Sequence, residues 1–152
     1  MRSIPVVDYL DFTSGDEERK SAFIQSVGDS LKDIGFFALK NHGIPLSAIE
    51  QSYEQGDAFF SMSEDVKKTY LQPQIAHQRG YTAFGIEHAK NNPAPDLKEF
   101  WQTGRSHPTS GKKPTYVENV WPENHLPQFR EVIDGLFSRM ENVSQNLLES
   151  CS

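Results

Sequence analysis

The sequence is poor in cysteine, lacks a long apolar run and has no excess of positive charge. Its single cysteine, Cys151, stands next to the last of the 152 residues, so these residues can form no internal disulfide, cysteine-based zinc cluster or CxxC redox centre. No stretch approaches the roughly 18 consecutive apolar residues of a membrane span, and the first residues lack the apolar segment of a signal peptide. We therefore expect a cytoplasmic protein without a membrane partner.

The charge balance excludes another class of partner. Lys and Arg number 15 against 21 Asp and Glu, which gives a net charge of -6, and the two signs are mixed along the chain. Proteins that bind nucleic acid neutralise phosphates with clustered basic residues, so we expect no nucleic-acid partner. With 152 residues, 36% of them hydrophobic, the chain can bury one core but hardly two. We predict a single domain over residues 1–152.

The common catalytic motifs are absent as well. The sequence contains no GxSxG, GxxxxGK[ST] or GxGxxG segment and no cysteine near a histidine. None of the five histidines is followed two residues later by Asp or Glu, and no HxxxH or HExxH pair occurs. A mononuclear metal site needs several ligands that converge from rigid elements. We therefore predict no catalytic residue and no metal ligand in this chain.

Apolar periodicity predicts helices joined by a few short strands, an α+β fold. A short strand is expected at residues 4–7, followed by a polar turn and a helix that begins near residues 14–17 and ends at Gly35. One buried stripe of that helix is predicted from three- and four-residue spacing, and its members are Phe23, Ile24, Val27, Leu31 and Ile34. A strand over residues 35–43 has apolar residues on both faces, so we expect most of it to be buried.

Three more helices are predicted further along. One follows Pro45, a short one has Ser63 as its N-cap, and a long one follows Pro127. The acidic residues in GDEERK and SEDVKK stand at helix starts, where they complement the helix dipole, so we interpret them as structural. Between residues 72 and 110 prolines and glycines predict short strands and loops, and residues 103–116 are the most loop-like part.

Polar residues embedded in aromatic sequence are the best candidates for ligand binding. Arg79 stands beside Tyr81 and Phe84, and its planar fork can hold a carboxylate while the rings exclude water. The alternative is an arginine that covers a core aromatic ring with no ligand. Lys98 and Glu99 are interpreted as a structural ion pair or cap.

Six segments in this order resemble a known family. They are IPVVDYLDF, GFFALKNHGIP, FFSMSEDVKKTY, RGYTAFG, DLKEFWQTGR and NVWP. Together they are similar to the N-terminal region, the non-haem dioxygenase N-terminal domain, of the isopenicillin N synthase-like Fe(II)/2-oxoglutarate-dependent oxygenases. The likeness runs from about Ile4 to Trp121. It implies a helix-rich region that packs on a double-stranded β-helix jelly roll, which is absent from these 152 residues.

The resemblance also assigns roles to residues. In the family the iron ligands, a His-x-Asp pair and a distal His, lie on the jelly roll, so Fe(II) and 2-oxoglutarate are implied for the full-length enzyme and neither is expected to be held by this chain alone. His42, at the end of the predicted strand, would bind backbone groups rather than metal. Arg79, Tyr81 and Phe84 would line the pocket of a small-molecule substrate. Trp121 and Pro122 would form a packing corner before the last helix.

Two interpretations remain open at this point. The chain is the scaffold and substrate-pocket part of an oxygenase that hydroxylates, desaturates or cyclises a small organic molecule, and as 152 residues it has no activity of its own. Alternatively, it is a stand-alone binding module or truncated relic of that family, without catalysis.

Overall fold

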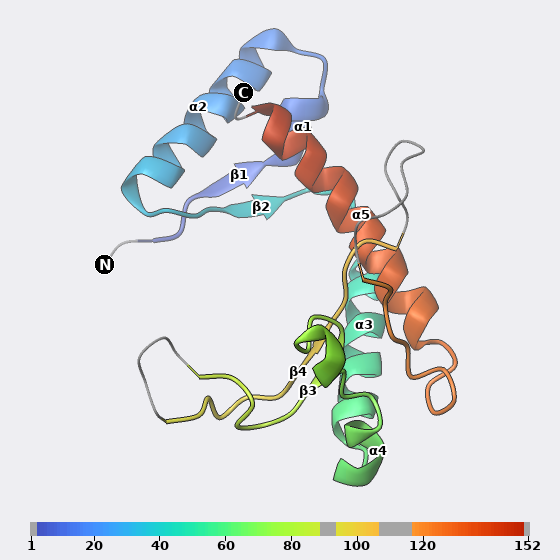
Figure 1. The fold of residues 1–152 in the computed structure, drawn as a ribbon. Helices are drawn as coiled ribbons and strands as arrows, with labels where there is room; N and C mark the ends of the chain where they lie inside the picture. Colours follow the sequence, from blue (N-terminus) through green and yellow to red (C-terminus); the bar gives the residue numbers. More distant parts are fainter. Residues whose placement is uncertain (1–2, 89–93, 107–116, 151–152) are drawn as a thin grey trace. The chain divides into compact units, whose positions relative to one another are not determined.

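The computed structural model describes residues 3–88, 94–106 and 117–150. The chain divides into two compact units: unit 1 is Met1–Leu46 with Ser138–Ser152, and unit 2 is Ser47–Phe137. Helices predominate, as Figure 1 shows, and each strand is three residues long, so the predicted helix-rich α+β fold is confirmed. Most of the predicted loop over 103–116 lies outside the described residues. No helix in the described part has the length and apolarity that crossing a membrane requires.

Unit 1 is built on a two-stranded parallel sheet covered by a helix. Strand β1 (Val6–Asp8) pairs with β2 (Ala38–Lys40), with Val7 opposite Leu39. Helix α2 (Glu17–Asp33) supplies Phe23 and Val27, which are buried together with Val7. The predicted stripe of α2 is therefore confirmed at its centre, although Ile24 and Leu31 stay 39% and 43% exposed.

The ends of α2 follow from local hydrogen bonds. The Asp16 carboxylate accepts hydrogen bonds from the backbone N–H groups of Glu18 and Arg19, at 3.0 and 3.1 Å, and so caps the first turn. Gly35 adopts a positive φ of 93° and donates its N–H to the carbonyl of Ser30 at 3.1 Å, which only glycine does without steric cost. Both predicted helix ends are confirmed.

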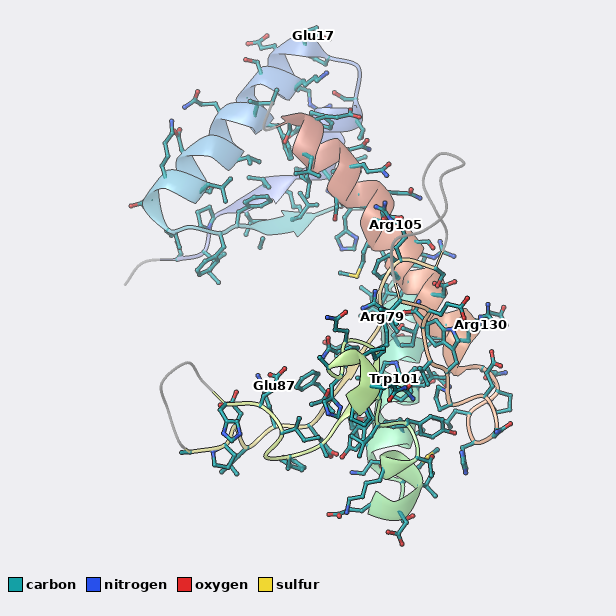
Figure 2. All side chains as sticks on the ribbon, in the orientation of Figure 1. Glu17, Arg79, Glu87, Trp101, Arg105 and Arg130 are labelled. Carbon is teal, nitrogen blue, oxygen red and sulfur yellow. The ribbon has the colours of Figure 1, made fainter. Side chains whose placement is uncertain are left out.

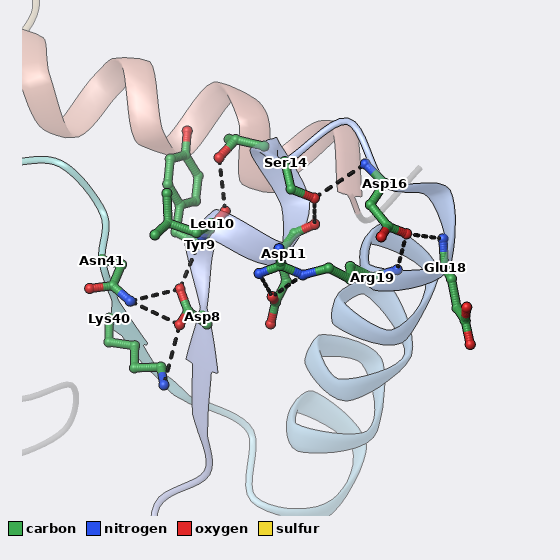
Figure 3. A network of polar contacts seen from close by, with 11 residues as sticks. Asp8, Tyr9, Leu10, Asp11, Ser14, Asp16, Glu18, Arg19, Lys40 and Asn41 are labelled. Carbon is green, nitrogen blue, oxygen red and sulfur yellow. Dashed lines mark hydrogen bonds and ion pairs between the residues drawn. The ribbon is translucent and has the colours of Figure 1, made fainter.

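The polar turn predicted after the first strand was wrong, because a short helix begins there. Helix α1 spans Tyr9–Thr13, and Asp8 caps it by accepting a hydrogen bond from the N–H of Leu10 at 3.1 Å (Figure 3). Phe12 of this helix packs on Phe23, with ring centroids 5.5 Å apart. This partly buried ring, together with the N-cap, stabilises a helix too short to be recognised from periodicity.

The prediction that most of the strand over 35–43 is buried was also wrong. Leu39 and Phe37 face the cluster under α2, but Ala38 and Lys40 on the other face are exposed. Phe36, two residues before Ala38, is 53% exposed. Only one face of the β1–β2 sheet is covered within unit 1.

Unit 2 packs helices on an antiparallel β-hairpin. Its elements are α3 (Leu46–Phe60), α4 (Glu64–Lys68), the 3-10 turn η1 (Pro73–Ile75), β3 (Gly80–Thr82), β4 (Phe100–Gln102) and the first part of α5 (Phe129–Ser150). The fully buried ring of Phe59 lies at the centre of the core, 4.7 Å from the ring of Trp101 and 5.9 Å from that of Tyr70. The three predicted helices after residue 44 are confirmed.

Candidate functional site

The predicted ligand-binding residues lie before, within and after strand β3. Tyr81 pairs with Trp101 of β4, and Arg79 directly precedes the strand (Figure 2). Phe84 follows in a turn and is 56% exposed. The hairpin therefore fixes Tyr81 within β3, whereas Arg79 lies before the strand, on the other side of Gly80 with its φ of 75°, and Phe84 lies beyond the paired residues.

Tyr81 is part of the core as well as a candidate wall of a pocket. Its side chain is 3% exposed and its ring lies 5.7 Å from that of Phe59. The hydroxyl donates a hydrogen bond of 2.5 Å to Oε2 of Glu99. Burial, and then the hydrogen bond to the Glu99 carboxylate, raise the pKa of Tyr81 far above the ordinary value of a tyrosine. The hydroxyl is therefore a fixed donor, not a base.

The carboxylate of Glu99 is held from the other side by a lysine. The Nζ of Lys67 lies 2.8 and 3.1 Å from the two oxygens of Glu99 and donates to the carbonyl of Phe60 at 3.2 Å. Lys67 is only 6% exposed. Glu99 is therefore part of a structural ion pair, as predicted. Its partner Lys67 was not predicted, because a lysine in a short charged helix is usually exposed to solvent.

The predicted structural role of Lys98 is confirmed with different partners. Its Nζ lies 3.1 Å from Glu87 and 3.2 Å from Asp96, and hydrogen bonds to these two carboxylates raise the pKa of Lys98 above its ordinary value. The side chain is 53% exposed, so this pair contributes little to stability.

The guanidinium of Arg79 lies directly against Gly104. A Cβ on residue 104 would stand 2.6 Å from Cζ and 2.9 Å from Nε of Arg79, so only glycine leaves room for this arrangement. Nη1 donates to the carbonyl of Gln78 at 2.6 Å. Among the described residues Nε of Arg79 and Nε1 of Trp101 are buried donors without an acceptor. Buried donors are nearly always paired in folded proteins, so these two are exceptions.

Gly104 is itself held by the amide of Asn119. Oδ1 of Asn119 accepts from the Gly104 N–H at 2.8 Å, and Nδ2 donates to the Gly104 carbonyl at 2.7 Å. Nδ2 also donates to Oγ of Ser106 at 2.9 Å, and that hydroxyl donates to Asp134 at 2.7 Å. The sequence did not predict that Asn119, Ser106 and Asp134 hold Gly104 in place beside Arg79. The one available signal was Asn119 in the NVWP segment.

The residues after Asn119 form the predicted packing corner. Pro122 is fully buried, and Trp121 packs on the core with its ring 6.4 Å from that of Phe129. The carbonyl of Pro122 accepts hydrogen bonds from the N–H groups of His125 and Leu126 just before α5. The corner therefore leads the chain into the long helix.

His42 binds backbone, as predicted. Its Nδ1 accepts a hydrogen bond of 3.1 Å from the N–H of Ile44. Asn41 and Gly43 on either side have φ values of 56° and 75°, which turn the chain out of β2. Within residues 3–88, 94–106 and 117–150 no three His, Cys, Asp or Glu side chains lie together as metal ligands. The described residues therefore do not fit an iron site.

Comparison with known proteins connects these observations. Residues 4–124 match the family model described as non-haem dioxygenase in morphine synthesis, N-terminal. The 2-oxoglutarate-dependent dioxygenase thnC of Trichoderma harzianum is 31% identical over 152 residues, which cover 97% of this chain and 46% of that protein. The proline hydroxylase buaE of Petromyces alliaceus is 31% identical over 150 residues, covering 95% of this chain and 45% of that protein.

A solved structure has the same fold. A 2-oxoglutarate–Fe(II) oxygenase family protein from Caulobacter crescentus superposes with a TM-score of 0.80 at 28% identity, and the match covers 99% of this chain and 48% of that one. The chain thus spans about half the length of the relatives that it matches. Since the family model covers most of the residues, the chain belongs to the family of N-terminal regions of Fe(II)- and 2-oxoglutarate-dependent oxygenases.

Proposed function

We propose that this chain is the N-terminal part of a cytoplasmic Fe(II)/2-oxoglutarate-dependent oxygenase that hydroxylates, desaturates or cyclises a small organic molecule. The family match over residues 4–124, with relatives about twice as long, is the observation that carries this proposal. As a single N-terminal domain, the chain serves as scaffold and as one wall of the substrate pocket. Its packing partner is the jelly roll of the full-length enzyme.

In this proposal Arg79 orients an acidic or polar group of the substrate. Its Nε is a buried donor without a partner among the described residues, and the absence of a side chain at Gly104 leaves room for the guanidinium. Charge-assisted hydrogen bonds from arginine to a carboxylate are among the stronger polar contacts in proteins. Phe84 contributes an exposed ring to the apolar wall, and Tyr81 contributes through its position between Phe59 and Glu99.

The iron and the 2-oxoglutarate belong to the jelly roll in this proposal. The described residues of this chain offer no cluster of three metal-ligating side chains, and His42 already uses Nδ1 on the backbone. When bound there, the iron and the oxo acid supply the oxidising chemistry. The residues described in this chain bind and orient the substrate and exclude water.

A hybrid protein tests the role of Arg79. The chain is joined to the part of thnC that lies beyond the aligned residues, and consumption of 2-oxoglutarate is measured with a panel of small molecules with and without a carboxylate. Arg79→Ala should raise KM for carboxylate substrates by about 10- to 100-fold, because it removes charge-assisted hydrogen bonds. Arg130→Ala is the matched control, because Arg130 is 55% exposed and pairs only loosely with Glu123 at 3.5 Å.

Two results would count against this proposal. Equal kinetics of the Arg79→Ala and Arg130→Ala hybrids would remove Arg79 from the pocket. Capture of panel molecules by the 152-residue chain, with no turnover in the hybrid, would favour the stand-alone binding module instead.

A further inference from the structure

The side chain of Asn119 holds the backbone of Gly104 at two points. Its Oδ1 accepts a hydrogen bond from the Gly104 N–H at 2.8 Å, and its Nδ2 donates to the Gly104 carbonyl at 2.7 Å. Neither residue lies in a helix or a strand, so these two bonds take the place of the regular backbone pairing that would otherwise fix Gly104. The position of Gly104 therefore depends on the Asn119 side chain.

A carboxylate on α5 sets the direction in which the Asn119 amide points. The hydroxyl of Ser106 donates to Oδ1 of Asp134 at 2.7 Å. An ionised carboxylate can only accept hydrogen bonds, so the Ser106 oxygen is left as an acceptor, and it accepts from Nδ2 of Asn119 at 2.9 Å. The amide oxygen of Asn119 then faces the Gly104 N–H. The chain of hydrogen bonds thus has one direction, from Gly104 to α5.

Gly104 in turn limits where the guanidinium of Arg79 can lie. Cζ and Nε of Arg79 stand 2.6 and 2.9 Å from the place that a Cβ of residue 104 would occupy, and Nη2 stands closer still. The group is therefore packed directly on the glycine. Nη1 is fixed by its hydrogen bond of 2.6 Å to the carbonyl of Gln78. A shift of Gly104 would change the direction of the remaining donors, Nε and Nη2.

The direction of these donors matters for binding an anion. A guanidinium is a rigid planar fork, and its strongest contacts with a carboxylate are paired, parallel hydrogen bonds. Arg79 lies outside β3 and has a long side chain, so its neighbours must impose the direction of its fork. A displacement of about 1 Å in a positioned group can cost about 100-fold in rate. All residues of this chain of contacts belong to unit 2.

We propose that Asn119 is a positioning residue that aims the guanidinium of Arg79 at a carboxylate of the substrate, an inference that rests on the proposed function. Asn119 acts through Gly104 and does not itself touch the substrate. Without its amide the Gly104 backbone is free to shift, and the fork of Arg79 turns with it. The enzyme then loses its preference for carboxylate substrates, while the apolar part of the pocket is unchanged.

Phenylglyoxal, which reacts with guanidinium nitrogens, tests the positioning in the 152-residue chain itself. Peptide mass spectrometry gives the labelling rate of Arg79, and Arg19 in unit 1, with a side chain 51% exposed, is the internal reference. Asn119→Ala removes the clamp. Asn119→Asp keeps the size and the Oδ1 acceptor but places a carboxylate oxygen beside the Gly104 carbonyl. Asn124→Ala is the matched control, because Asn124 is an exposed asparagine of the same segment.

Both Asn119 variants should label Arg79 about 10-fold faster relative to Arg19, because the loss of the clamp bonds releases the guanidinium from Gly104. Asn124→Ala should leave the ratio unchanged. Circular dichroism shows whether each variant is folded. Ser106→Ala removes only one bond to Nδ2 and should give a smaller rise, so this variant decides the matter if the Asn119 variants do not fold.

Kinetics of the hybrid with thnC separate positioning from a structural role. Each variant is measured with a carboxylate substrate and with its neutral amide analogue. Asn119→Ala should raise KM for the carboxylate by about 10-fold and change kcat, and KM for the amide, by less than about 2-fold. In an Arg79→Ala hybrid the same substitution should have no further effect on the ratio of the two KM values, because its effect passes through Arg79.

Three results would overturn the inference. The first is unchanged labelling of Arg79 in every folded variant among Asn119→Ala, Asn119→Asp and Ser106→Ala. The second is an equal rise of KM for the carboxylate and the amide. The third is a rise for the carboxylate that persists in the Arg79→Ala hybrid.

Failure of the inference can be told apart from failure of the proposed function. Unchanged labelling of Arg79, in a hybrid whose KM for carboxylates depends on Arg79, keeps the function and refutes the role of Asn119. Faster labelling of Arg79, in a hybrid whose kinetics ignore Arg79→Ala, keeps Asn119 as the residue that holds the guanidinium and refutes the proposed role of Arg79 in substrate binding.

Discussion

The Nζ of Lys67 lies 2.8 Å from Oε2 of Glu99, and the two side chains are only 8% and 16% exposed. This pair joins α4 to the segment just before β4, 32 residues further along the chain. The same carboxylate accepts a hydrogen bond from the hydroxyl of Tyr81, so one buried charge pair also holds strand β3, which carries Tyr81.

Removal of one member of this pair should destabilise the protein strongly. Glu99→Ala leaves Lys67 without its partner in a site withdrawn from water, which should lower the free energy of unfolding by about 3 kcal/mol. Urea unfolding followed by circular dichroism measures the change. Lys98→Ala removes an exposed neighbour and should leave the midpoint almost unchanged, and the double variant Lys67→Met, Glu99→Leu should recover most of the loss. Equal midpoints for Glu99→Ala and Lys98→Ala would contradict the buried pair.

Tyr81 should make stability depend on alkaline pH. Its pKa is raised in the folded protein, so its contribution is complete below the unfolded value of about 10 and is lost as pH rises above that. The advantage of the wild-type chain over Tyr81→Phe should be constant from pH 7 to 9 and shrink above pH 10. Tyr53→Phe, at a residue 73% exposed, should follow the wild type at every pH. A wild-type advantage that persists unchanged to pH 11 would contradict the fixed donor.

Gly104→Ala should push Arg79 out of its place. The added methyl group would meet the guanidinium, which is the far end of a flexible side chain, so the free energy of unfolding should fall by only about 1 kcal/mol. Gly56→Ala, in α3 with nothing within 4 Å of the new Cβ, should instead raise it by about 0.5–1 kcal/mol. The double variant Arg79→Ala, Gly104→Ala should be more stable than Gly104→Ala alone. If Gly104→Ala behaves like Gly56→Ala, the close approach of Arg79 is refuted.

Asn41 should protect unit 1 against acid. Hydrogen bonds from its amide are the main cause of the lowered pKa of Asp8, so this stabilisation is present above about pH 4 and is lost as pH falls through the lowered pKa. Asn41→Gly keeps the positive φ of 56° accessible but removes the amide. The wild type should exceed Asn41→Gly in melting temperature at pH 7, and the gap should close on acidification. A gap that stays constant down to pH 2 would refute the role of the Asn41–Asp8 bond.

The parts of the fold that could be predicted from sequence follow local rules. The limits of α2 follow from Asp16 and Gly35, which cap its two ends, and apolar spacing identified Phe23 and Val27 as core. Helix α1 could not be recognised because five residues give too little periodicity. The exposure of Phe36 and Ala38 could not be foreseen either, since an apolar strand face predicts a covering layer without saying which part of a protein supplies it.

The candidate site also contains residues that could be predicted from sequence and residues that could not. Arg79, Tyr81 and Phe84 were selected from residue type and family resemblance, and their function as a substrate wall stays a prediction. The supports of Arg79 come from residues that are distant in sequence: Gly104 is 25 positions away, and Asn119 is 15 positions beyond Gly104. Lys67 was missed for the same reason, because its partner Glu99 is 32 residues distant. Spacing rules describe one helix or strand at a time and do not reveal such pairs.

Anaerobic titration with Fe(II) and 2-oxoglutarate tests the central claim most directly, because the metal–oxo acid complex has a weak visible charge-transfer band. The account predicts no band for the 152-residue chain and a band for the hybrid with the remainder of thnC, in which the added half supplies the ligands. A band of equal strength in the 152-residue chain alone, abolished by His42→Ala, would show that this chain holds the iron itself and would contradict its assignment as the supporting half.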